Sequence, residues 1–383
     1  MKKPVYLDYH ATTPVDPRVV EAMAPYWTEK FGNAASRNHA YGWEAKKAVE
    51  RAREQVAALI NANPREIVFT SGATESNNLA IKGVAEHAGA GEIVTVVTEH
   101  KAVLDPVARL EERGFAAILF PVDSQGFLDL GHLAEAISDK TIILSVMYAN
   151  NEIGVIQDIP RIGEIVRESG AVFHVDAAQA VGKIPVDVER DGIDLLSISG
   201  HKLYAPKGVG ALYVRRRGRR VELTQQMDGG GHERGMRSGT LNVPAIVGLG
   251  EACALCSAEM GQEAKRLGKL RDRLQGRLLA ELDGLRINGG PDRRLPNNLN
   301  IAFEGVDGES LLMGLRDVAV SSGSACTSEL PEPSHVLRAL GLPDKLAGSS
   351  LRFGLGRFTT EEEIDYAAER VVEQVKRLRT LAG

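Results

Sequence analysis

Between about residues 44 and 254 the chain alternates short apolar runs with amphipathic stretches. Seven runs are typical of buried strands rich in β-branched residues: EIVFTSG, EIVTVV, AAILFPV, TIILSVMYAN, AVFHVDAAQ, DLLSISG and GALYVRR. Helical stretches such as WEAKKAVERAREQVAALI and IPRIGEIVRESG lie between several of them. This succession of strand, helix and strand predicts an α/β fold with a mostly parallel central sheet that helices cover on both faces.

The pattern changes after about residue 251. GQEAKRLGKLRDRLQGRLLAELDG is helical, PNNLNIAFEG and SSLRFGLGRF are typical of strands, and a short helix is expected near 309–316. The last helix is predicted to open on a capping box formed by Thr360 and Glu363. We therefore predict a large domain over residues 15–254 and a smaller α+β domain made of residues 1–14 and 255–383.

Composition excludes several classes of function. A net charge of −5 gives no overall attraction to nucleic acid or acidic membranes, and three cysteines cannot form a disulfide framework. The start, MKKPVYLDYHATTPVDP, lacks the apolar core of a signal peptide, and no stretch reads as a membrane span. We expect a cytoplasmic protein with no membrane partner and no direct nucleic-acid partner. The run RRRGRR at 215–220 is interpreted as a solvated turn, the alternative being a docking patch for an acidic protein face.

The stretch DLLSISGHKLYAPKGVG places Lys202 directly after an apolar strand. A lysine that is desolvated at such a position has a lowered pKa and can form a Schiff base with an aldehyde. The alternative is an exposed lysine at the end of a strand.

Two further segments end strands with groups that could bind a cofactor. FHVDAAQ puts Asp176 where its carboxylate could pair with a pyridinium nitrogen, or else cap a helix. EIVFTSGATESNNLAIKG reads as a strand, a turn and a helix start, where backbone N–H groups and Thr74 could bind phosphate. The carboxyl ends of the strands of a parallel sheet lie around one crevice. The turn with Thr74, the Asp176 carboxylate and the Lys202 amine could therefore bind, in that crevice, the phosphate, the ring nitrogen and the aldehyde of pyridoxal 5′-phosphate.

At this point the chain resembles the fold-type I pyridoxal-phosphate enzymes, and more closely the cysteine desulfurases of the IscS and NifS type. The resemblance extends nearly from end to end. It rests on ten segments in order: YLDYHATTPVDPRV, FGNAASRNH, EIVFTSGATESNNLAIKG, TEHKAVLD, NNEIGVIQDI, HVDAAQAVGK, SGHKLYAPKG, GGGHERGMRSGTLN, SSGSACTS and LRFGLGRFTTEEEID.

The resemblance implies roles for residues around the cofactor ring. Lys202 would form the internal aldimine and then shuttle protons, and Asp176 would pair with the pyridine nitrogen. Gln179 would bond the ring hydroxyl, with Asn151 beside it. His100 would stack on the ring and handle protons.

The resemblance also implies how the phosphate and the substrate are held. The phosphate would contact Ala73, Thr74, Ser199 and His201, together with Thr240 of a second subunit, so a homodimer is expected. Arg352 would clamp the carboxylate of L-cysteine, since a guanidinium binds a carboxylate bidentately, and Asn33 would assist it. The alternative for Arg352 is a surface arginine at a strand end.

In the stretch AVSSGSACTSELPEPSH, Cys326 lies in an expected flexible arm between Ser-Gly-Ser and two prolines. The resemblance implies that its thiolate attacks the substrate sulfur, which leaves a persulfide and releases alanine. The sulfur would pass to an iron–sulfur scaffold protein for cluster assembly, or to an acceptor for tRNA thiolation. No intrinsic metal is predicted, although Cys326 could contact a cluster on a partner. The alternative is an inert loop thiol.

Other interpretations remain at this stage. Cys253 and Cys256 form a C-x-x-C that we interpret as packing residues of a helix, not as a metal or redox pair. A selenocysteine lyase or an aminotransferase could use the same scaffold, but an aminotransferase has no use for Cys326. A non-catalytic scaffold is disfavoured by the intact Lys202 and Asp176. The sequence ends at LRTLAG, without the tail by which housekeeping relatives dock the scaffold protein, so the physiological acceptor stays open.

Overall fold

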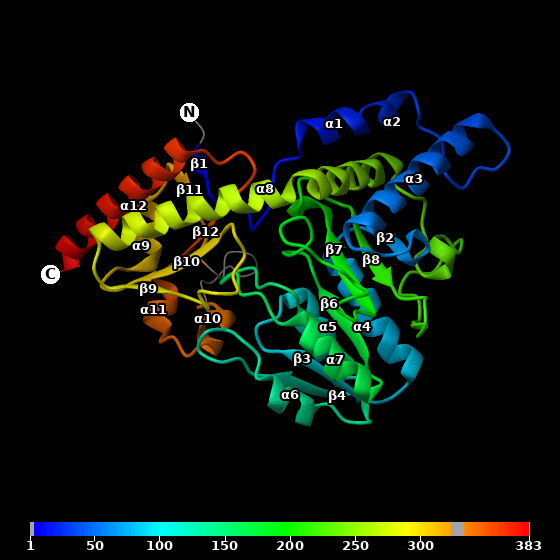
Figure 1. Cartoon of the computed structure of the whole chain (residues 1–383), viewed down its shortest axis with the longest axis horizontal. Coiled ribbons are helices and arrows are strands. Elements are labelled where there is room, and N and C mark those ends of the chain that lie inside the picture. Colours follow the sequence, from blue (N-terminus) through cyan, green and yellow to red (C-terminus); the bar gives the residue numbers. More distant parts are fainter. Residues whose placement is uncertain (1–3, 323–332, 383) are drawn as a thin grey trace.

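The computed structural model describes residues 4–322 and 333–382, and its larger part is built on a seven-stranded sheet (Figure 1). The strands lie in the order β2-β8-β7-β6-β5-β3-β4. They are β2 (Ile67–Thr70), β3 (Glu92–Val96), β4 (Ala116–Phe120), β5 (Thr141–Met147), β6 (Val172–Asp176), β7 (Leu195–Ser199) and β8 (Gly210–Val214). Neighbours from β7 to β4 pair in parallel, and β8 runs antiparallel to both of its neighbours. Each of the seven predicted runs forms a strand, so the mostly parallel sheet is confirmed.

Helices cover both faces of this sheet. They are α1 (Pro17–Met23), α2 (Pro25–Thr28), α3 (Ala40–Leu59), α4 (Ala73–Ala88), α5 (Lys101–Glu111), α6 (Leu130–Ala136) and α7 (Ile159–Ser169), with short 3-10 turns η1 (Pro64–Glu66), η2 (Gly200–Lys202) and η3 (Glu233–Gly235). Adjacent strand residues enter different cores: Phe69 packs with α3 and α7, whereas Val68 packs with α4 and α5. Successive strand side chains point to opposite faces, so both faces are buried and the strands are apolar throughout.

The smaller part contains two short sheets. In one, β10 (Asn298–Phe303) pairs antiparallel with β12 (Ser350–Gly354) and with β9 (Leu285–Ile287); in the other, β1 (Val5–Tyr6) pairs in parallel with β11 (Val318–Ala319). Its helices are α9 (Gly308–Gly314), α10 (His335–Ala339), α11 (Asp344–Gly348) and α12 (Glu361–Ala382). The predicted capping box is confirmed, because Thr360 and Glu363 each accept the other's backbone N–H, at 3.2 and 3.0 Å.

The long helix α8 (Val243–Glu281) runs along both parts of the molecule (Figure 1). It begins well before the predicted start near residue 261, where the Asn242 side chain caps the N–H of Ala245. Its first half packs in the core of the large sheet and its second half in the core of the small domain. Cys253 and Cys256 are buried free thiols of the first half, as predicted. The predicted boundary at residue 254 therefore falls within a continuous helix, and the domain limits stay a prediction.

By length and composition alone, α8 could also cross a membrane. It has 39 residues and contains an 18-residue window of mean hydropathy 1.4, which the sequence analysis did not anticipate. Half of that window is buried inside the protein, as in the core helix of a globular domain.

Candidate active site

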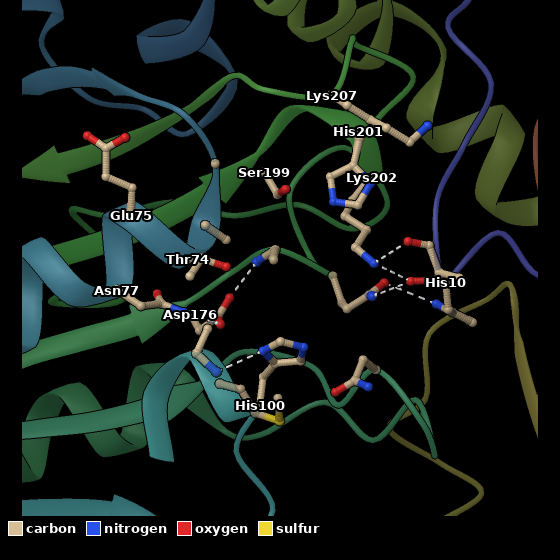
Figure 2. A pocket seen from close by; sticks show the side chains of 18 of the residues that line it. His10, Thr74, Glu75, Asn77, His100, Asp176, Ser199, His201, Lys202 and Lys207 are labelled. Carbon is tan, nitrogen blue, oxygen red and sulfur yellow. Dashed lines mark hydrogen bonds between the residues drawn. The ribbon is translucent and has the colours of Figure 1, made fainter. Parts of the chain in front are cut away.

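A cavity of about 450 Å³ lies where β6 and β7 end and α4 begins (Figure 2). The structure brings ten of the residues singled out in the sequence to its walls. They are Ala73, Thr74, His100, Asn151, Asp176, Gln179, Ser199, His201, Lys202 and Arg352. β6 and β7 are parallel neighbours, so Asp176 and Lys202, which end or follow them, are carried to the same edge of the sheet.

Lys202 lies in the turn η2, directly after β7, and its side chain points across the cavity (Figure 2). Its Nζ donates to the carbonyl oxygens of His10 and Ala11, at 2.5 and 2.7 Å. The turn requires glycine at position 200, because a Cβ there would lie 2.8 Å from the carbonyl oxygen of Val209. Lys202 is therefore a partly buried amine held by neutral acceptors, unlike an exposed lysine at a strand end.

The Asp176 carboxylate is 6% exposed and is fixed at both oxygens. Oδ2 accepts the side-chain amide of Asn77 at 2.7 Å, and Oδ1 accepts the N–H of Ala178 at 2.9 Å. The sequence analysis missed Asn77. A signal was present, since Asn77 follows Ala73 by one helical turn and lies on the same face of α4.

The start of α4 supplies a site for an anion. Its N-cap is Gly72, which offers no side-chain hydrogen bond, and the first-turn residues Ala73 and Thr74 line the cavity with Ser199 and His201. A Cβ on Gly210 would lie 2.6 Å from the Cα of Gly72, so the neighbouring strand leaves this turn room only because it carries glycine there. Uncapped N–H groups at the positive end of a 16-residue helix suit a phosphate.

Three histidines, His10, His100 and His201, line the cavity, and burial lowers the pKa of each. Burial lowers the pKa of His100, and its Nδ1 accepts the N–H of Ala102 at 3.0 Å, so its proton lies on Nε2. Burial and the Lys202 ammonium lower the pKa of His201 to about 4. In its neutral form each ring offers one N–H donor and one acceptor nitrogen.

Arg352, on β12, closes the cavity on the side of the small domain. It is 3% exposed, which contradicts the alternative of a surface arginine. Nη2 donates to Asp8 at 2.9 Å and Nη1 to the carbonyl of Asn151 at 3.1 Å, while Nε is buried with no partner among the described residues. A buried guanidinium that lines a cavity is suited to a carboxylate ligand.

Comparisons with known proteins agree with this arrangement. The profile of the family described as aminotransferase class-V matches residues 5–367. The protein "Cysteine desulfurase IscS" of Anaeromyxobacter dehalogenans (strain 2CP-C) is 58% identical over 384 residues, which cover 100% of this chain and 95% of that protein. The protein of the same name from Neisseria meningitidis (strain FAM18) is 59% identical, with the same coverage.

The chain belongs to the class-V aminotransferase family, and within it to the IscS cysteine desulfurases. Solved structures give the same result. A NifS-like protein superposes with a TM-score of 0.91 at 39% identity, covering 98% of this chain and 100% of that one. SspA in complex with cysteine gives a TM-score of 0.82 at 37% identity, with 93% and 99% covered. The predicted family and fold type are thus confirmed.

Two described residues that the desulfurase resemblance assigned to the site do not line this cavity. Asn33 and Thr240 are exposed and do not line it, and Asn33 instead accepts the N–H of Ala35. Cys326 lies outside the described residues. Within the described ranges, no group of three or more His, Cys, Asp and Glu side chains is placed to hold a metal ion.

Described residues on either side of the Cys326 segment contact Arg352, which lines the cavity, and Glu152 and Glu99, which directly precede or follow the lining residues Asn151 and His100 in the chain. Ser321 exchanges backbone hydrogen bonds with Arg352. Ser334 donates its hydroxyl to Glu152 at 2.5 Å, and His335 Nε2 donates to the carbonyl of Glu99 at 3.0 Å. Both ends of the segment are therefore anchored beside residues of the candidate substrate site.

Glu152 is nearly fully buried, and burial raises the pKa of its carboxyl to about 7, against the opposing effects of Ser334 and Arg352. Ionisation is thus harder in the folded than in the unfolded chain. The wild type should lose up to about 3 kcal/mol of unfolding free energy as pH rises from about 4.5 to about 7. Glu152→Gln should lack this loss, so its free energy of unfolding should rise relative to that of the wild type across this pH range. Urea unfolding at successive pH values measures the difference.

The matched control is Glu164→Gln, which removes an exposed carboxylate of α7. It should follow the wild-type profile. A constant difference between Glu152→Gln and wild type at all pH values would contradict the assigned ionisation.

Proposed function

We propose that this chain is a pyridoxal-phosphate-dependent cysteine desulfurase that converts L-cysteine to L-alanine and transfers the sulfur to its own Cys326. One observation carries the proposal: the uncapped start of α4, the Asp176 carboxylate and the Lys202 amine converge on one cavity that buried Arg352 closes. The names of the relatives and the cysteine-bound neighbour support L-cysteine as the substrate.

The donor set fits the cofactor at three points. The first turn of α4, with Thr74, Ser199 and His201, would hold the phosphate. Asp176, kept in place by Asn77 and the N–H of Ala178, would face the ring nitrogen, and Lys202 would meet the aldehyde. Pyridoxal phosphate, when bound, supplies an electron sink for the substrate carbon chain.

The chain's own residues supply the remaining functions. Arg352 binds and orients the substrate carboxylate, and Lys202 Nζ holds and moves protons at the substrate. The Cys326 thiolate attacks the substrate sulfur: the S–S bond forms, the C–S bond breaks, and the carbon keeps that electron pair and takes a proton. One cysteine and one enzyme thiol thus give one alanine and one persulfide, with no external oxidant or reductant.

Surfaces outside the cavity support a homodimer. Trp27, Phe31 and Trp43 are 61%, 64% and 59% exposed on the arm from α2 to α3, which projects from the large domain (Figure 1). The loop that carries exposed Thr240 is tied to the start of α4 by the ion pair of Arg237 with Glu75 at 2.8 Å. We propose that a second copy covers the arm and receives Thr240 at its phosphate site. The acceptor of the persulfide sulfur would be a cytoplasmic iron–sulfur scaffold protein or a tRNA-thiolation protein.

The proposal is tested with L-cysteine and a thiol reductant. Alanine and sulfide should form in equal amounts from the wild type with added pyridoxal phosphate. Amino-group transfer to a keto acid without sulfide would overturn the desulfurase assignment in favour of an aminotransferase, and a strong preference for selenocysteine would favour a lyase.

Arg352→Gln should raise the KM for L-cysteine about a hundredfold, because truncation removes the charged partner of a buried carboxylate. Steady-state alanine formation measures the change, and Arg161→Gln on the exposed face of α7 serves as the control. An unchanged KM in a folded Arg352→Gln protein would exclude the carboxylate role.

A further inference from the structure

A second lysine, Lys183, lies close to the candidate site without lining its cavity. Its Nζ donates to Oε1 of Gln179 at 2.6 Å, and Gln179 does line the cavity. Lys183 itself borders a separate small cavity with Tyr204 and Glu263. The family resemblance assigns Gln179 to the hydroxyl of the cofactor ring, but neither it nor the proposed function gives Lys183 a role.

The hydrogen bonds around Gln179 determine which way its amide faces. Nε2 of Gln179 donates to the backbone carbonyl of His10 at 3.0 Å, and a carbonyl can only accept. Oε1 then faces the lysine amine, which donates, and also Nδ1 of His10 at 3.0 Å. That nitrogen must therefore carry the His10 proton. Each end of the amide thus has its own partner. A flipped amide would place its nitrogen against the Lys183 donor and its oxygen against the His10 carbonyl.

This orientation leaves a donor available at the cavity. An amide nitrogen has two hydrogens, and within the described residues the backbone carbonyl of His10 is the one partner of Gln179 Nε2. The second hydrogen can reach a ligand in the cavity that Gln179 lines.

Charged groups of several elements surround Lys183. Burial lowers the pKa of Lys183 to about 7, and the nearby cations Lys202 and Arg352 act in the same direction. Cys256 and Glu263, both on α8, act in the opposite direction. His10 stays neutral, because burial and Lys183 hold its pKa well below the usual range. Even when neutral, the lysine amine still donates to Gln179, so the amide orientation does not depend on its charge.

We propose that Lys183 is a positioning residue that fixes the amide of Gln179 so that its nitrogen is presented as a donor to the oxygen on the cofactor ring. This inference rests on the proposed function, and it takes the place of Gln179 beside that oxygen from the family resemblance and from the position of Gln179 on the cavity wall. A donor there favours the ionised oxygen and lowers the pH at which the visible absorption of the bound cofactor changes. Without Lys183, Oε1 keeps only the His10 donor, so the amide is held less firmly and turns its own oxygen toward the ring in part of the molecules, where two acceptors repel.

The test is a pH titration of the visible absorption of the protein with added pyridoxal phosphate. Lys183→Met should raise the midpoint by about one pH unit. Lys183→Arg keeps a donor and should stay near the wild-type midpoint. Lys140→Met, at an exposed site before β5, is the matched control and should change nothing.

A double-mutant cycle separates positioning from the charge of the lysine. Gln179→Leu removes the donor and should raise the midpoint by itself, and Lys183→Met should then add little. An equal shift from Lys183→Met in both backgrounds, or no shift in either, would overturn the proposal. Failure of the wild type to develop any visible absorption would instead refute cofactor binding, and with it the proposed function.

Discussion

Lys202→Ala is expected to abolish the visible absorption that pyridoxal phosphate gives with the wild type, and to lower alanine formation from L-cysteine by at least about a thousandfold. Lys202 Nζ is the amine that the turn after β7 directs into the cavity, where the carbonyl oxygens of His10 and Ala11 hold it. Alanine has no group that can bond the cofactor aldehyde or move a proton there. Absorption spectra and steady-state rates at saturating cofactor measure both effects.

The substitution should leave much of the cofactor affinity in place. The first turn of α4 and the Asp176–Asn77 pair do not depend on the Lys202 side chain. Equilibrium dialysis should therefore show cofactor bound to the variant without the spectral signature, and Lys140→Ala should behave as wild type. A variant that kept both absorption and turnover would rule out Lys202 as the cofactor lysine.

The sequence predicted the large sheet and its active edge because local patterns determine both. Each run of β-branched residues was long enough for one strand, and both faces of the sheet are buried, so the strands are apolar throughout. Asp176 and the turn that carries Lys202 come at the ends of β6 and β7, which are neighbours in a parallel sheet. Chain order alone therefore brings these two side chains together.

Contacts from distant segments could not be predicted in this way. His10, Ala11 and Asp8 belong to the short N-terminal segment, yet they bind Lys202 and Arg352, nearly 200 and 344 residues later in the chain. No periodicity encodes such a contact. The beginning of α8 at Val243 was missed for another reason. Cys253 and Cys256 were expected on a helix, but residues 243–256 carry a single charged residue, Glu251, and so lack the polar stripe that identifies a surface helix.

The roles predicted for Asn33 and Thr240 involve the proposed second chain. Both are exposed in one protomer and lie away from its cavity, so neither local pattern nor a single fold can test the roles that the family resemblance gave them. Only the arrangement of two subunits decides whether Thr240 meets a phosphate.

Cys326→Ala is expected to retain cofactor binding and its visible absorption but to lose at least about 99% of alanine formation. The residues of the cavity are unchanged by this substitution, so the cofactor should bind as before. Breaking the C–S bond of the substrate, however, requires an acceptor for the sulfur, and the variant has none. Alanine and sulfide release should be measured at matched cofactor occupancy.

The position of the thiol can be tested by the mass of the protein after one turnover. Wild type treated with L-cysteine without reductant should gain the mass of one sulfur, and Cys326→Ala should gain none. Cys253→Ala is the control, since it removes a fully buried thiol of α8 and should keep the added sulfur. Of the described residues that flank the Cys326 segment, Ser321 pairs with Arg352, which lines the cavity, and Ser334 donates to Glu152, next to the lining residue Asn151. Native rates of sulfide release from Cys326→Ala would exclude a covalent persulfide at this position, and the buried thiols are too enclosed to replace it.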